Sequence, residues 1–279
     1  AGHSNTFLGH YAGHGNTSGN HNTLIGHVAG LNGIGSDNVV IGSYSGYNAV
    51  SFANNVFIGK SSGINMRSGS SNVVIGKDAL YTSRGAGGNV AIVGSAVYYN
   101  TTGYQFTAVG QAAGQNATTG VGWVGIGYKA GFESTTASGS VFLGFTAGET
   151  VTTGNKNIAI GHDAMNGSTT TGDNNIAIGA SAGDALTSAY QNVLIGRNAG
   201  GSIDTGDFNT AVGDNALKSA TNSQYNAVFG LNAGDGTVTG DRLTLIGTAA
   251  GRGVIDNDGQ GTVAIGYAAY NVGTSGQGN

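Results

Sequence analysis

Short stretches of alternating side chains recur along this chain at nearly constant spacing. Residues 22–30 read NTLIGHVAG, and sixteen imperfect versions of this stretch occur from end to end. We call the residue at its centre the anchor, and twelve of the fifteen intervals between anchors are 17 residues long. A short fixed period is typical of a solenoid, in which each turn packs against its neighbours. The anchors are Gly9, Gly26, Gly42, Gly59, Gly76, Val93, Gly110, Gly127, Gly144, Gly161, Gly179, Gly196, Gly213, Gly230, Gly247 and Gly266.

The three residues before each anchor predict a β-strand. A large apolar residue directly precedes the anchor in all sixteen repeats, and Thr, Val or Ile stands three before it in fifteen. β-Branched residues at alternate positions favour a strand, because their stiff side chains pack well on a pleated surface. We call these two positions the flanking columns and expect them to point into the solenoid.

The residue between the flanking columns, the middle column, is expected to point outward. No polar side chain occupies it. A strand that is apolar on both faces is buried on both faces, and a slim solenoid has only one interior. The second apolar face therefore predicts self-association, so that Phe57→Asp would separate copies whereas Ile58→Asp would unfold the chain. The candidate residues of this face are Phe7, Leu24, Val40, Phe57, Val74, Phe142, Leu194, Val228 and Leu245.

Two further columns indicate how the turns stack. Asn stands four before the anchor in eleven repeats, where side chains about 4.8 Å apart could form a hydrogen-bonded ladder. Ala or Ser stands three after the anchor in every repeat, which indicates a tight corner. Val93 replaces the anchor glycine once, so we expect this corner not to require positive φ in every turn. The pattern predicts an all-β protein, a parallel β-solenoid of 15 to 16 turns that forms one domain over residues 1–279.

Composition narrows the classes of function. The 279 residues include 54 Gly but no Pro and no Cys, and only 9% are charged. The missing cysteine excludes disulfides and thiolate chemistry, and ten Lys and Arg within a net charge of −4 give no basic patch for nucleic acid. No apolar run approaches the ~20 residues that a membrane span needs. Because the chain opens at Ala1, we expect a fragment or a processed product of a longer protein.

We predict that the protein is not an enzyme and has no cofactor. Short matches to a nucleophile elbow at residues 59–63 and to a dinucleotide fingerprint at residues 125–130 are ordinary copies of the repeat. No carboxylates cluster on neighbouring turns as a polysaccharide-cleaving site would need.

Two pairs of residues are weak candidates for metal ligands. His10 and His27 share a column in adjacent turns, so their rings should lie about 5 Å apart. Asp256 and Asp258 resemble the start of a calcium loop but lack its later ligands. A solvated polar face and an Asp/Gly turn are the simpler interpretations, so we predict no metal site.

An aromatic-rich stretch is the candidate recognition surface. Phe106 replaces the ladder asparagine in one repeat and Trp123 replaces it in the next. Exposed aromatic rings could form a platform for a carbohydrate or a protein partner. Alternatively, the same rings fill the space between subunits. The recognition candidates are Tyr98, Tyr99, Tyr104, Trp123 and Tyr128.

The repeat also resembles that of known surface fibres. The runs Asn-Val-Val-Ile-Gly76 and Asn-Ile-Ala-Ile-Gly179 look like the repeat of the YadA-type heads of trimeric autotransporter adhesins, although the period here is longer. Asn-Thr-Ala-Val-Gly213 is similar to repeats of phage tail fibres and other microbial surface fibres. The resemblance covers essentially the whole chain. It implies a left-handed parallel β-roll, three chains packed side by side, and an extracellular adhesive or spacer role.

We therefore expect a structural or adhesive component of an extracellular fibre, on a cell surface, in a secreted filament or on a virion. The expected partners are further copies of the chain, as a homotrimer or an end-to-end filament, and a glycan or protein of a host surface or matrix. The alternatives are an ice-binding or a carbohydrate-binding solenoid. Ice binding needs a regular threonine face, whereas the threonines three before the anchor are scattered and expected to point inward.

Overall fold

The computed structural model describes residues 2–33, 35–85, 87–237, 239–253 and 261–270. These residues contain no helix, and the chain is a parallel β-solenoid of about 15 turns with a repeat of about 17 residues. The predicted fold class is therefore confirmed. Two compact units, Ala1–Ser138 and Gly139–Asn279, are both built from this repeat. The single domain over residues 1–279 stays a prediction.

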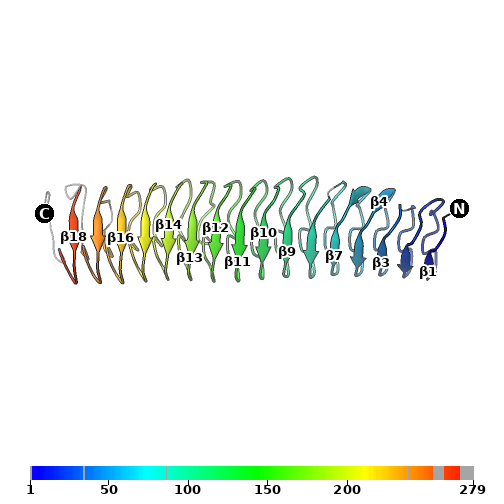
Figure 1. Cartoon of the computed structure of the whole chain (residues 1–279), viewed down its shortest axis with the longest axis horizontal. Coiled ribbons are helices and arrows are strands. Elements are labelled where there is room, and N and C mark those ends of the chain that lie inside the picture. Colours follow the sequence, from blue (N-terminus) through cyan, green and yellow to red (C-terminus); the bar gives the residue numbers. More distant parts are fainter. Residues whose placement is uncertain (1, 34, 86, 238, 254–260, 271–279) are drawn as a thin grey trace. The chain divides into compact units, whose positions relative to one another are not determined.

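Each turn contributes one three-residue strand to the main sheet of its unit, and the strands of a unit follow one another in chain order (Figure 1). Those of the first unit are β1 (Thr6–Leu8), β2 (Thr23–Ile25), β3 (Val39–Ile41), β5 (Val56–Ile58), β7 (Val73–Ile75), β8 (Val90–Ile92), β9 (Thr107–Val109) and β10 (Val124–Ile126). Those of the second unit are β11 (Val141–Leu143), β12 (Ile158–Ile160), β13 (Ile176–Ile178), β14 (Val193–Ile195), β15 (Thr210–Val212), β16 (Ala227–Phe229), β17 (Thr244–Ile246) and β18 (Val263–Ile265). A separate parallel pair joins β4 (Ser51–Ala53) to β6 (Ser68–Ser70).

Parallel pairing keeps every repeat in register. Val73 lies opposite Val90, and Ile75 lies opposite Ile92. The 18-residue interval that separates two anchors of the second unit leaves the register unchanged, since Ile158 still lies opposite Ile176. Differences in repeat length are therefore absorbed by the loops, and each sequence position forms a straight column within its unit.

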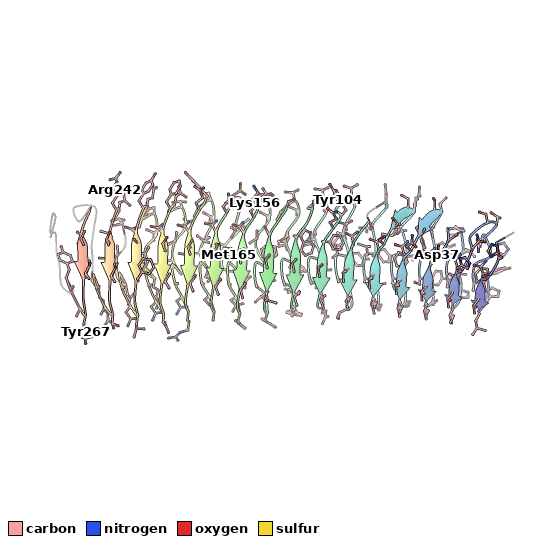
Figure 2. All side chains as sticks on the ribbon, viewed as in Figure 1. Asp37, Tyr104, Lys156, Met165, Arg242 and Tyr267 are labelled. Carbon is pink, nitrogen blue, oxygen red and sulfur yellow. The ribbon has the colours of Figure 1, made fainter. Side chains whose placement is uncertain are left out.

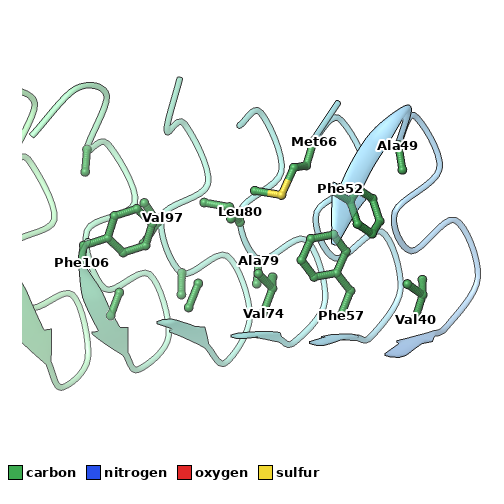
Figure 3. Packing of buried hydrophobic residues seen from close by; sticks show 14 of the residues in the cluster. Val40, Ala49, Phe52, Phe57, Met66, Val74, Ala79, Leu80, Val97 and Phe106 are labelled. Atoms are coloured by element: carbon green, nitrogen blue, oxygen red, sulfur yellow. The ribbon is translucent and has the colours of Figure 1, made fainter. Parts of the chain in front are cut away.

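The strand faces alternate as predicted, but the inside and the outside are exchanged. Except for Phe7 of β1, every candidate of the middle column is fully buried within the chain, and Figure 3 shows Val40, Phe57 and Val74 in the core. The flanking columns are half-buried or exposed instead. The prediction that the middle column is a self-association face is therefore wrong. The buried candidates are Leu24, Val40, Phe57, Val74, Phe142, Leu194, Val228 and Leu245.

Phe7 has the same orientation but is 40% exposed, because β1 pairs with only β2 among the described strands. The middle column ranges in size from Gly125 to Phe142. Such variation suits an interior in which a neighbouring side chain can fill the remaining space.

That neighbouring side chain comes from the position four after the anchor. An added Cβ at Gly148 would lie 2.2 Å from Cδ1 of Phe142, and one at Gly63 would lie 2.7 Å from Cε2 of Phe57. In several turns with a smaller strand residue, a larger side chain occupies the later position, and both are fully buried. The pairs are Val74 with Leu80, Ala91 with Val97, Ala159 with Met165, and Ala211 with Leu217.

The anchor corner requires positive φ throughout. The glycine anchors have φ between 127° and 143°, and an added Cβ at Gly110 would lie 2.2 Å from the carbonyl oxygen of Gly127. Val93 has a φ of 87°, so the expectation that this corner does without positive φ is wrong. The reason is the stacking of turns: the Val93 N–H donates to the Ile75 carbonyl at 2.6 Å, and this bond holds the valine on the common backbone path.

The asparagine ladder is confirmed. The backbone N–H of Asn209 donates to Oδ1 of Asn192 at 2.9 Å, and its Nδ2 donates to the same oxygen at 3.0 Å. Asn192 Nδ2 in turn donates to Oδ1 of Asn175 and to the Gly206 carbonyl at 2.9 Å. These asparagines are buried, so the ladder satisfies backbone groups that have no access to water.

Replacing one rung tests the ladder. Asn192→Ala leaves the Asn209 N–H and the Gly206 carbonyl without their partner, so the free energy of unfolding should fall by about 2–4 kcal/mol. Urea unfolding followed by circular dichroism measures this change. The exposed Asn222→Ala is the control and should change stability by less than about 0.5 kcal/mol. Equal stability of the two variants would contradict a structural role for the ladder.

Candidate functional site

The outward face of each main sheet is formed by the flanking columns. Apart from Ala227, their residues are β-branched or large and apolar, and none of them is charged in any of the sixteen strands. Most are half-buried by their neighbours within the sheet, while Ile126, Leu143 and Phe229 are 38%, 42% and 40% exposed. This arrangement leaves two uncharged columns, apolar except for five threonines, side by side on the outer surface of each unit, and we call this surface the outer face.

Charged side chains begin at the position directly after the anchor. Lys60 and Lys77 occupy it in successive turns of the first unit. In the second unit, the Arg197 Nη2 lies 2.8 Å from the Asp214 Oδ2 at the same position. Polar and charged residues thus border the outer face on one side, as they border the apolar centre of many protein interfaces.

Trp123 lies in the core, and its prediction as a recognition residue is wrong. The ring is fully buried and stacks on Phe106 with centroids 5.4 Å apart. An added Cβ at Gly114 would lie 2.1 Å from the Trp123 ring, so the ring takes the space left by small neighbours. The Trp123 indole N–H and the Asn89 Nδ2 have no hydrogen-bond partner. Phe106 and Trp123 therefore fill space in the core and interrupt the asparagine ladder in two successive turns.

The tyrosines of the candidate set stay at the surface. Tyr98 stacks on Tyr81 with centroids 4.7 Å apart, and Tyr99 meets the Tyr98 ring edge-on at 4.7 Å. Burial raises the pKa of the Tyr98 hydroxyl, and Tyr81, Asp78 and Tyr99 add to the rise. Tyr99 is 48% exposed. The structure therefore brings Tyr81, which the sequence analysis left out, into contact with two of the candidates.

Tyr104 and Tyr128 do not belong to that cluster. Tyr104 is 47% exposed and points outward from its loop (Figure 2). Tyr128 is 40% exposed and lies next to Lys129, whose Nζ is 5.8 Å from the ring centroid. The five aromatic candidates thus divide into one core residue, one tyrosine pair and two separate surface positions.

The histidine geometry follows the prediction. The His10 and His27 rings stack with centroids 5.4 Å apart and an interplanar angle of 5°. Parallel rings in this stack do not aim their nitrogens at a common point, and no group of three or more His, Cys, Asp or Glu able to hold a metal occurs in the described part of the chain. Asp256 and Asp258 lie outside the described residues.

The sequence analysis expected the columns of the outer face to point inward. The available signal was uniformity: the position three before the anchor is Thr, Val or Ile in fifteen repeats, whereas the middle column varies widely. A shape-matched core requires variation in size, whereas a surface that meets one regular partner can be uniform.

No protein-family model matches the chain, and no curated protein matches it. Across the described residues, there is no helix with the length and apolar character that a membrane crossing requires.

The single tryptophan offers a direct test of the core assignment. Because Trp123 is fully buried, its fluorescence emission should be blue-shifted and resistant to quenching by acrylamide in the folded protein. Trp123→Ala should lower the free energy of unfolding by about 3–5 kcal/mol in urea, because it leaves a cavity. Tyr128→Ala is the surface control, with an expected change of less than about 1 kcal/mol. Emission typical of solvated indole would contradict the assignment.

Proposed function

We propose that the protein is a structural or adhesive component of an extracellular fibre, assembled from copies of the same chain through the outer face. The observation that carries this proposal is the pair of uncharged, largely apolar columns on the outer surface of the sheets. Large apolar patches that stay in water are rare on monomeric proteins and mark interaction sites.

A second copy of the chain is the partner that fits the outer face best. Both chains repeat at the same strand spacing of about 4.8 Å, so contacts made at one turn can be repeated at the next without loss of register. Burial of apolar surface contributes about 25 cal/mol per Å². The contribution of each turn is modest, but it adds up along a unit with many identical turns.

The same proposal includes a mechanical role for the protein outside the cell. A chain in which 9% of residues are charged and no cysteine occurs depends for its stability on backbone ladders and a buried core rather than on ion pairs or disulfides. A rigid ladder suits a load-bearing shaft or head. We propose three copies in the assembly, as the resemblance to adhesin heads implies, and a mechanical rather than a catalytic role outside the cell.

Charges placed on the outer face test the assembly. Ile58→Asp combined with Ile92→Asp puts two carboxylates on that face two turns apart, so the chain should stay folded while its native mass falls to that of one chain. Phe57→Asp puts a carboxylate in the core and should cost at least about 4 kcal/mol of stability. The sequence analysis expected the reverse, with Phe57→Asp separating the copies and Ile58→Asp unfolding the chain.

The matched control is Thr102→Asp combined with Thr136→Asp, which places the same charges two turns apart on exposed loop positions. This variant should keep the mass of the assembly. Native mass spectrometry or sedimentation measures all four proteins, and circular dichroism checks their folding. A wild-type protein that is monomeric at micromolar concentration would refute self-association through this face.

The outward position of the flanking columns also favours a second candidate. Thr23 and Thr107 lie on the outer face rather than in the core, contrary to the expectation from the sequence. A flat face of β-branched residues at regular spacing is the geometry that an ice-binding solenoid would use. A thermal-hysteresis measurement on the wild-type protein tests it: inhibition of crystal growth, lost in Thr23→Lys and Thr107→Lys, would favour ice binding over self-association.

A further inference from the structure

Two hollows in the first unit join into one shallow groove. The first, of about 190 Å³, is lined by Asn65, Arg67, Thr82 and Arg84. The second, of about 520 Å³, begins at the same Thr82 and ends at Glu133 and Thr135. The residues that line the groove form two columns, each with one residue per turn. One wall is the column from Asn65 to Glu133, and the other is the column from Arg67 to Thr135, both at intervals of 17 residues. We call this surface the Arg–Thr groove. None of its residues belongs to the main strands.

The first end of the groove is positively charged. Arg67 and Arg84 occupy the same column in successive turns and are exposed, and neither forms an ion pair with a carboxylate of the described residues. The backbones of adjacent turns lie about 4.8 Å apart, so the two like charges they carry repel one another, and a bound anion would relieve this repulsion. Guanidinium groups bind sulfate and carboxylate oxygens through paired hydrogen bonds. This end therefore fits the acidic substituent of a larger ligand.

The second end is shaped for the apolar side of a sugar. The Thr101 hydroxyl donates to the Thr118 carbonyl at 3.1 Å, and the Thr118 hydroxyl donates to the Thr135 carbonyl at 2.8 Å. These bonds direct the hydroxyls along the stack, so the methyl groups are left to line the groove. Tyr99 adds an aromatic ring that its contact with Tyr98 orients. Flat apolar surface of this kind packs well against the C–H face of a pyranose ring.

Polar groups along the opposite wall supply hydrogen bonds to hydroxyls. Asn116 Nδ2 donates to Glu133 Oε2 at 3.0 Å, which holds the carboxylate in place and leaves its other oxygen as an acceptor. Asn65 accepts a bond from Asn48 at 2.9 Å through Oδ1, so its Nδ2 remains a donor toward the first hollow. This wall thus offers a donor at Asn65 and an acceptor at Glu133.

An extended peptide fits this surface less well. A peptide that adds a strand needs unpaired backbone N–H and C=O groups. In the groove, these groups bond between turns: the Thr101 N–H donates to the Thr118 carbonyl at 3.0 Å, and the Thr118 N–H donates to the Thr135 carbonyl at 2.9 Å. We propose that the Arg–Thr groove binds a polysaccharide that carries sulfate or carboxylate groups, with the acidic group at Arg67 and Arg84 and a sugar ring on Tyr99.

This site is independent of the proposed assembly, because one chain carries the whole groove. Affinity electrophoresis in gels that contain dextran sulfate, with unmodified dextran and polyglutamate gels in parallel, tests it at physiological salt. The wild-type protein should be retarded by dextran sulfate and by neither of the other two polymers. No retardation, or equal retardation by polyglutamate or dextran, would overturn the proposal.

Variants locate the site. Arg67→Gln combined with Arg84→Gln should weaken binding about tenfold or more, because two charge-assisted contacts are lost. Tyr99→Ala should weaken it about fivefold by removal of the ring under the sugar. The matched control, Lys60→Gln combined with Lys77→Gln, removes the same charge from exposed positions in successive turns and should bind within about twofold of the wild type.

Equal losses of affinity in the double arginine variant and the double lysine variant would overturn the assignment of the binding site to the groove. They would indicate diffuse charge attraction instead. Wild-type affinity in Tyr99→Ala would place the polymer outside the groove. Thermal unfolding checks that each variant folds, and Arg67→Lys combined with Arg84→Lys, which keeps the charge, gives a second readout. It should bind more weakly than the wild type because lysine cannot form the paired contact.

Discussion

The stacking of equivalent backbone positions is the constraint on which every other feature depends. Each turn gives its N–H and C=O groups to the turns beside it, so a residue must repeat the backbone path of the residue 17 positions away. The bond from Val93 to Ile75 shows how strong this constraint is, because a β-branched side chain is held at a φ of 87° to preserve it. The glycines, the small corner residues and the asparagine ladder all serve this common path.

A common path converts sequence positions into straight columns, and each column then acts as one surface. Inside, the middle strand residue and the residue four after the anchor lie close together, and in several turns their sizes compensate, so Phe142 stands with Gly148 whereas Ala159 stands with Met165. The interior can therefore vary from turn to turn while neighbouring side chains fill it. Outside, no such exchange is needed, and the outer face stays uniform over many turns.

The arrangement of residues in columns also explains where a binding site can form on the surface of a solenoid. Two neighbouring columns of outward side chains in a solenoid can enclose a groove that runs along the stack of turns. The Arg–Thr groove arises this way from loop positions that carry no strand, and its charge changes along its length because Arg67 and Arg84 give way to threonines. A structural role for the outer face and a binding role for the groove are compatible, since they use different columns.

The amino-acid sequence by itself determined the period, the all-β class, the parallel register, the asparagine ladder and the closeness of His10 to His27. Each of these follows from spacing alone, because stacked turns bring equal positions together. Only the tertiary structure decided which strand face is inside, that Trp123 is a core residue and that the anchor corner has positive φ even at Val93. Alternation defines the two faces of a strand but does not say which of them is inside. The direction in which the chain turns at its corners decides this, and that direction depends on backbone angles that the alternating residue types do not specify.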